Sequence, residues 1–408
     1  MAAPRAGAAL AWLAGACFAG LLMVGRTDLA RLSPTSPRGP LMELRLYLVV
    51  ALGLLVVGAM AVGREGPDRT AGPSPDWRAV GLLLVSLLGA GASFVWSWGD
   101  DAAVVKLYEV FLVVVSAGLV ALLARAWPEE SSEGFWVAVL GFGILLAALG
   151  VRALGSAATG EGRLAVLGGG PNVFGRLMGL LGMACLWQLG RCGRWARVWL
   201  IGLAGIAGML GLLTGSRGAL VGFSVGLALY VWVERVPVRR VLGVFVAGLL
   251  VLVPVVAALG IWSRMYDIIQ NRFVGLLVKR VYTAGRGALL DVALDRSAAA
   301  LGAGHGLASF GFRGFHYPHN LVVELLYEAG LLAASALVAG ALWLLFRLVR
   351  DRRAGLGPAA GAWAMILAAS MFSGDLYDAR GVFLLPLLLL FTPAARGDAR
   401  LFEGTIPR

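Results

Sequence analysis

All three histidines of the chain fall in one short stretch, Gly302 to Ala333. Within it, Pro318 precedes an apolar segment, and proline is favoured at the first positions of a helix. His319 and Asn320 are therefore expected beside a helix N-terminus, where unpaired backbone N–H groups carry partial positive charge. A histidine at that place is biased towards the neutral form, which can accept a proton. We predict that His319 is a general base.

Arginines stand at two other places where an anion could bind. Arg217, in the pentapeptide Thr-Gly-Ser-Arg-Gly, follows a glycine turn and opens an apolar segment. A helix N-terminus attracts anions, and a guanidinium adds a bidentate phosphate clamp. Arg176 follows Pro171-Asn172 at the start of another apolar segment. These residues predict a site for a phosphate or diphosphate group.

Other polar residues within apolar segments are further candidates, because ionisable groups inside a membrane span are costly and usually functional. Lys106 could contact substrate, but it lies three residues before Glu109, so a structural ion pair on one helix is the alternative. Arg45 is expected to snorkel towards the headgroups. The further candidate site residues are Asn320, Glu324, Lys106, Arg313 and His316.

Aspartate pairs and histidine spacing give no metal site. Asp100-Asp101, and likewise Asp375 and Asp378, are expected to cap helices or turns. His316 is three residues from His319, but no carboxylate or cysteine lies near enough in the sequence to complete a metal site. We therefore expect neither a metal nor a cofactor.

The segments that carry these residues are membrane spans. The chain has 408 residues, of which 59% are hydrophobic, and its mean hydropathy is +0.83, which is far outside the soluble range. With roughly 20 apolar residues per span, we predict an all-α polytopic membrane protein with about twelve transmembrane helices. Spans one to nine fall within residues 1–262, a long periplasmic loop covers 263–318, and spans ten to twelve fall within 319–408. The spans are predicted to begin near Ala8, Leu41, Ala79, Ala102, Gly134, Pro171, Trp195, Arg217, Arg239, His319, Pro358 and Leu376.

The distribution of basic residues predicts the orientation of these spans. With both termini in the cytoplasm, most of the Lys and Arg in the tails and short loops fall on the cytoplasmic side. The long loop and the ionisable residues within the spans then face outward, where the loop's excess of basic residues calls for an anionic partner. The net charge of +12 comes from arginines scattered over short loops, so we expect no binding of nucleic acid.

Several motifs resemble the O-antigen ligase and O-antigen polymerase superfamily of bacterial inner membranes. In the long loop and after it, Gly302-x-Gly304, His319-Asn320 and a glycine after nine further residues, Gly330, resemble one family motif. The family often has a small or hydroxyl-bearing residue three positions after that glycine; Ala333 stands there, a mild departure. Three shorter motifs also match: Pro171-Asn172, Ser216-Arg217-Gly218, and Gly-Arg at Arg286. The tryptophan that the family usually has after Gly-Arg is missing here.

The resemblance implies a metal-independent glycosyltransferase of the C-type membrane architecture, with its site on the periplasmic face. The donor would be a glycan on undecaprenyl diphosphate. Arg217, Arg286 and Arg176 would stabilise the departing diphosphate, and His319 would deprotonate the acceptor hydroxyl. We expect an O-antigen ligase, whose acceptor is a lipid A core. A polymerase, whose acceptor is a lipid-linked glycan, is the alternative, and a third branch of the family glycosylates proteins.

A transporter of lipid-linked sugars is an alternative from a different functional class. It would also use many spans, contacts with membrane lipids and outward-facing arginines. Transporters often show internal repeats and interrupted helices, and the sequence indicates neither of them.

Overall fold

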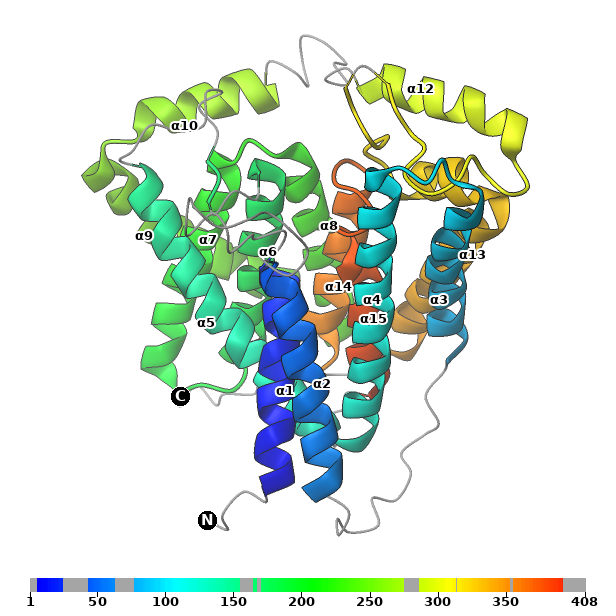
Figure 1. Cartoon of the computed structure of the whole chain (residues 1–408). Coiled ribbons are helices and arrows are strands. Elements are labelled where there is room, and N and C mark those ends of the chain that lie inside the picture. The colour runs from blue at the N-terminus through cyan, green and yellow to red at the C-terminus, as the bar shows by residue number, and fades with distance from the viewer. Residues whose placement is uncertain are drawn as a thin grey trace, which may run out of the picture.

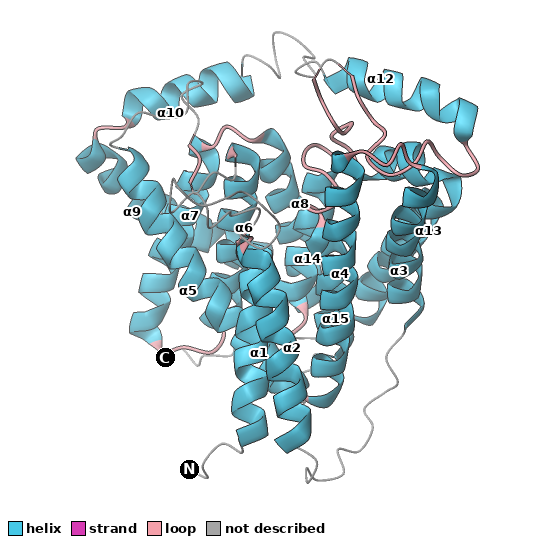
Figure 2. Ribbon diagram, in the orientation of Figure 1, coloured by secondary structure: helices cyan, strands magenta, loops and turns pink. Residues whose placement is uncertain are grey.

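The computed structural model describes residues 6–24, 43–62, 77–154, 164–166, 170–274, 286–312, 314–352 and 355–391. Within these ranges the protein consists of helices and connecting loops, without a strand (Figure 2). The first nine helices are α1 (Ala6–Met23), α2 (Leu44–Val62), α3 (Trp77–Ala92), α4 (Asp101–Ala126), α5 (Pro128–Leu154), α6 (Pro171–Leu189), α7 (Arg194–Leu213), α8 (Arg217–Glu234) and α9 (Val238–Leu259). The later ones are α10 (Trp262–Ile268), α12 (Arg286–Ser297), α13 (Leu321–Asp351), α14 (Gly357–Ser370) and α15 (Arg380–Phe391).

Among the described residues, eight helices are long and apolar enough to cross a membrane. They are α1, α2, α3 with the short 3-10 helix that follows it, α4, α5, α7, α8 and α13. The apolar helices α14 and α15 are shorter. The chain is thus a helical, multi-pass membrane protein. Helices begin close to all the predicted span starts, and the largest difference is at α5, which begins at Pro128. The twelve-span count and the periplasmic position of 263–318 stay predictions.

Two helices mark one end of the bundle. In Figure 1, α10 and α12 lie across the top of the bundle, whereas the first turn of α1 lies at the bottom. We call the top the α12 end. Helices α4 and α13 begin at the α12 end and run away from it, so their first turns carry the residues that can face a site there.

Close helix crossings depend on small residues, as is common in membranes. A Cβ added at Gly15 of α1 would lie 2.1 Å from the carbonyl oxygen of Ser131 in α5. A Cβ at Gly226 of α8 would lie 2.4 Å from the carbonyl oxygen of Gly361 in α14. The second crossing holds α14 tightly against α8.

Helix α13 is interrupted at Gly330, which corrects the expectation that no span is broken. Gly330 has φ 81° and ψ −175°, a backbone conformation that side chains rarely allow. A Cβ there would lie 2.3 Å from the carbonyl oxygen of Gly302. The loop before α13 fills the break: Leu331 N donates to Leu301 O at 2.7 Å, and Gly306 N donates to Glu328 O at 2.9 Å. The loop therefore replaces backbone hydrogen bonds that the helix has lost.

Candidate functional site

The turn between α14 and α15, residues 371–379, joins several predicted site residues, and we call it the central turn. The Asn320 amide nitrogen donates to the carbonyl oxygen of Met371 at 3.1 Å. The backbone N–H of Leu376 donates to Glu324 Oε1 at 3.3 Å. Arg176 donates to the carbonyl oxygen of Asp378 at 3.2 Å. Residues far apart in the sequence therefore meet at one turn.

His319 and Asn320 lie at the start of α13, which confirms their predicted place at a helix N-terminus. Asn320 is the N-cap, and its side-chain oxygen accepts from Val322 N at 3.0 Å and from Val323 N at 3.2 Å. His319 has φ 60°, a left-handed conformation that is uncommon for a residue other than glycine. Its half-buried imidazole meets the Tyr317 ring edge-on, with centroids 4.5 Å apart.

Arg217 is the first residue of α8, as the sequence predicted. The helix is capped by Ser216, whose Oγ accepts from Ala219 N at 3.2 Å, and Gly215 before it has φ 61°. A Cβ added at Gly218 would lie 3.0 Å from the Cβ of Phe372 in the central turn. Arg217 is half-buried. The arginine thus sits at a helix N-terminus beside the central turn, where an anion would be favoured.

Arg176 is buried in α6, and its terminal nitrogens bond to carbonyl oxygens. Nη2 donates to Ala369 O at 3.1 Å, to Ser373 O, and to Ser373 Oγ at 3.0 Å. Its Nε has no hydrogen-bond partner among the described residues. The Nη groups of Arg176 therefore hold the end of α14 and the central turn in place.

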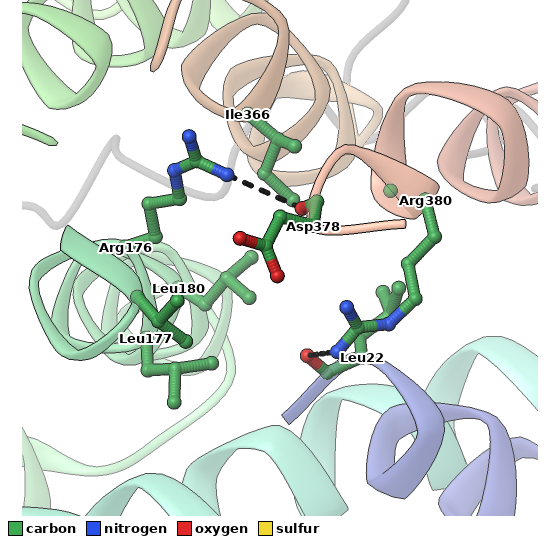
Figure 3. Close-up of a pocket in the computed structure, with 9 residues that line it drawn as sticks. Leu22, Arg176, Leu177, Leu180, Ile366, Asp378 and Arg380 are labelled. Carbon is green, nitrogen blue, oxygen red and sulfur yellow. Dashed lines mark hydrogen bonds between the residues drawn. The ribbon is translucent and has the colours of Figure 1, made fainter. Parts of the chain in front are cut away.

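A small cavity of about 30 Å³ lies beside Arg176. Figure 3 shows the Asp378 carboxylate between the guanidinium groups of Arg176 and Arg380. Arg380 donates to the carbonyl oxygens of Leu21 at 2.8 Å and Leu22 at 2.9 Å, and so caps the C-terminal end of α1. The cavity has room for ordered water, but it is far too small for a sugar.

Lys106 pairs with α13, not with the neighbouring glutamate that the sequence suggested. Its Nζ lies 2.5 Å from Glu324 Oε1 and 2.6 and 2.7 Å from the two carboxylate oxygens of Glu328. All three side chains are buried. We call these residues the lysine triad; it ties α4 to the first two turns of α13.

Glu109 pairs instead with Arg45. Arg45 Nη1 donates to Glu109 Oε1 at 2.8 Å, and Arg45 also bonds to Glu43. The Arg45 guanidinium stands 4.4 Å from the centre of the Tyr377 ring, within range of a cation–π contact. At 2% exposure, Arg45 does not snorkel, and the expectation from the sequence is wrong.

The remaining candidates are exposed or have side chains outside the described part of the structure. His316 is exposed. Arg286 begins α12, but its side chain is outside the described part of the structure, as is Arg313. Two capping predictions are confirmed: Asp100 Oδ1 accepts from Ala103 N at 2.8 Å, and Asp375 Oδ1 accepts from Asp378 N at 3.0 Å.

Arg380 and Tyr377 are the contributors that the sequence analysis missed. Tyr377 lies between two guanidinium groups, with Arg45 at 4.4 Å and Arg380 at 4.6 Å from its ring centre. A lone arginine inside the last predicted span was the available signal, because such residues are rarely placed in a span without a role.

Within the described ranges, no cluster of three or more His, Cys, Asp or Glu side chains is arranged to hold a metal ion. No protein-family model matches the chain, and no curated protein sequence matches it either. The assignment of a function therefore depends on the geometry around the central turn and on the sequence motifs.

Proposed function

We propose that this protein is a metal-independent glycosyltransferase of the bacterial inner membrane. It moves a glycan from undecaprenyl diphosphate to an acceptor hydroxyl on the periplasmic face. The most specific form of the proposal is an O-antigen ligase, with a lipid A core as the acceptor. The motifs that resemble the O-antigen ligase and polymerase superfamily support this choice.

One observation supports the proposal above the others. The central turn gathers the helix start with His319 and Asn320, the helix start with Arg217, and the buried Arg176. A candidate base and two candidate diphosphate-binding arginines therefore lie around one short segment at the α12 end. Arg286, at the start of α12, belongs to the helix that lies across the same end (Figure 1).

The chemistry assigned to these residues is a single displacement. The acceptor oxygen forms a bond to the anomeric carbon as the bond from that carbon to the diphosphate oxygen breaks. The acceptor proton passes to the imidazole of His319, acting as general base. Arg217 and Arg286 stabilise the negative charge that develops on the diphosphate. Arg176 adds positive charge without direct hydrogen bonds from its Nη groups, which already bond to carbonyl oxygens.

A second function is a transporter of lipid-linked sugars, and the break of α13 at Gly330 favours it. Interrupted helices commonly form substrate or ion sites in transporters. The break is filled by Leu301 and Gly306 of the loop before α13. A transporter would move the lipid-linked glycan across a bilayer without changing it chemically.

The test is a transfer assay with the purified protein in detergent. Undecaprenyl diphosphate-linked glycan is supplied alone, with a lipid A core acceptor, and in each case with and without EDTA. We expect product only when the acceptor is present, at the same rate in EDTA. A ladder of longer glycans from the donor alone would instead identify a polymerase. Unchanged donor in every reaction, with flipping of the donor in vesicles, would identify a transporter.

Arg217→Ala is the informative variant in the same assay. Removal of an electrostatic donor typically costs about 10²–10³-fold in rate, and Arg217→Lys should recover little because lysine lacks the planar fork. The matched control is Arg194→Ala. Arg194 is an exposed arginine at the first position of α7, a helix that ends beside α8 and so starts about 30 Å away. Full activity of Arg217→Ala would remove the diphosphate clamp from the proposal.

A further inference from the structure

The lysine triad joins two helices at a single point. One ammonium group bonds to carboxylates on successive turns of α13, Glu324 and Glu328. Lys106 enters from α4, 218 residues earlier in the chain than Glu324. The contact therefore sets both the height and the rotation of the first two turns of α13 relative to α4.

Stability is a weak explanation for this triad. Desolvation makes buried ion pairs costly, and apolar side chains of the same size often replace them without loss of stability. The triad also has two carboxylates for one ammonium, so its charges are not balanced internally. Glu324 Oε2 has no hydrogen-bond partner among the described residues. A geometric role explains the cluster better, because one side-chain oxygen of Glu324, Oε1, accepts from both Lys106 of α4 and Leu376 of the central turn.

The triad is connected to His319 through the central turn. Glu324 Oε1 bonds to both Lys106 and Leu376 N, and Glu324 N donates to the carbonyl oxygen of Asn320 at 2.9 Å. Asn320 in turn bonds to Met371. The first turn of α13 is therefore attached to the central turn at two points and to α4 at a third. These attachments begin at the residue after His319, whose left-handed backbone is uncommon for a side-chain-bearing residue.

We propose that Lys106 and Glu324 are positioning residues that fix the first turn of α13 and thereby aim the imidazole of His319. They contact neither the sugar nor the diphosphate. This inference rests on the proposed function of His319 as the base. Misplacing a catalytic group by about 1 Å can cost about 100-fold in rate, so loss of the triad lowers kcat and leaves the KM for the donor unchanged.

Two substitutions of Glu324 give the sharpest test. Glu324→Gln keeps an oxygen that accepts from Lys106 and Leu376 and leaves one carboxylate to pair with Lys106. We expect it to retain kcat within a few-fold. Glu324→Leu removes the acceptor, and we expect kcat to fall about 100-fold with an unchanged donor KM. A Glu324→Gln protein as inactive as Glu324→Leu would show that the carboxylate takes part in the chemistry. A raised donor KM in either protein would show that Glu324 contacts substrate. Each result would overturn the proposal.

Lys106 is tested in a variant that leaves no buried carboxylate of the lysine triad without a counter-ion. Lys106→Met leaves two buried carboxylates without a counter-ion and is expected to reduce folding. The triple variant Lys106→Met, Glu324→Gln, Glu328→Gln removes all three charges. We expect it to fold and to show the same loss of kcat at an unchanged donor KM. The control is Asp351→Asn, at the far end of the same helix. Wild-type kcat in the triple variant would overturn the role of Lys106.

Hydrogen exchange separates this inference from the proposed function. Backbone amides from Val322 to Leu325 should exchange faster in Glu324→Leu than in the wild type, and at the wild-type rate in Glu324→Gln. This readout needs no activity. Absence of transfer by the wild-type protein would refute the proposed function alone, whereas unchanged exchange in Glu324→Leu would refute the positioning role.

Discussion

The two ends of the bundle differ in whether their charged side chains are buried. Every buried charged side chain among the described residues lies at or near the α12 end, within the first three turns of a helix or in the central turn. These residues are Arg45, Lys106, Glu109, Arg176, Glu324, Glu328, Asp375 and Arg380. At the other end, the pair Arg347–Asp351 joins side chains that are 36% and 28% exposed. Glu234 there is half-buried, and it accepts from the backbone N–H groups of Gly355 and Gly357, both at 2.8 Å.

This difference distinguishes the uncharged contacts that hold the helices together from the buried charges around the proposed site. The same helices pass through both ends, and close contacts such as Gly226 with Gly361 hold them together without charge. Burying charge in a membrane protein is costly. The proposed site therefore accounts for the buried charges of the α12 end better than the stability of the bundle does.

The largest effect is expected at the α12 end, at His319. His319→Ala should lower transfer by about 10²–10⁴-fold, because it removes the proposed general base. Binding of the undecaprenyl diphosphate-linked glycan should persist, since the arginines supply that contact. A single-turnover transfer assay and a separate donor-binding measurement check the two statements.

The other two histidines are the controls for this prediction. His316 is exposed, and His305 is held by Arg296, with Nε2 2.9 Å from its carbonyl oxygen. His305→Ala and His316→Ala should retain substantial activity. Transfer at the wild-type rate by His319→Ala would end the assignment of the base.

Removing one buried charge should destabilise the protein more than removing one exposed charge. Arg45→Met leaves Glu109 buried without its ion-pair partner, which typically costs about 3–5 kcal/mol. Asp351→Asn should change stability by no more than about 0.5 kcal/mol, because its pair with Arg347 is partly exposed to solvent and joins residues one turn apart on the same helix. The free energy of unfolding in detergent measures both. Equal losses of unfolding free energy in the two variants would show that the two ends do not differ in how much their charged side chains affect stability.

The smallest of the three effects concerns the break in α13. Gly330→Ala places a Cβ 2.3 Å from the carbonyl oxygen of Gly302, and the backbone conformation alone costs about 1–3 kcal/mol. Gly141→Ala is the matched control: this exposed α5 glycine has nothing within 4 Å of an added Cβ. It should gain up to about 1 kcal/mol from helix propensity. Thermal unfolding in detergent measures both, and a neutral Gly330→Ala would show that the loop does not need the break.

Proline residues and capping side chains predicted several helix starts correctly. The prediction was wrong where polar residues extend the helix beyond its apolar segment. Pro171 and Arg217 begin α6 and α8, because proline and a serine cap act within one turn. Counting about 20 apolar residues per span placed the start of α5 at Gly134. The helix begins at Pro128, because its polar first turn is not part of the apolar segment.

The partners of the buried charges could not be predicted from the sequence. The short separation of Lys106 and Glu109 suggested a pair on one helix, yet Lys106 bonds to Glu324 and Glu109 bonds to Arg45, 64 residues away. Which partner a charge finds depends on how helices dock, and hydropathy carries no information about that. The last helix begins at Arg380 rather than Leu376, because the Asp375 cap and the ring of Tyr377 commit those residues to the central turn.

The distance along the chain between Lys106 and Glu324 has a consequence for biosynthesis. A ribosome adds about 5–20 residues per second, so the 218 residues that separate the partners take roughly 10–45 seconds to synthesise. During that interval Lys106 sits in a newly inserted helix without its carboxylates. Its position in the second turn of α4 lets the flexible stem reach the headgroups meanwhile. Helix α4 can therefore span the bilayer with its ammonium group in the headgroup region, and the lysine triad forms only after α13 has been inserted.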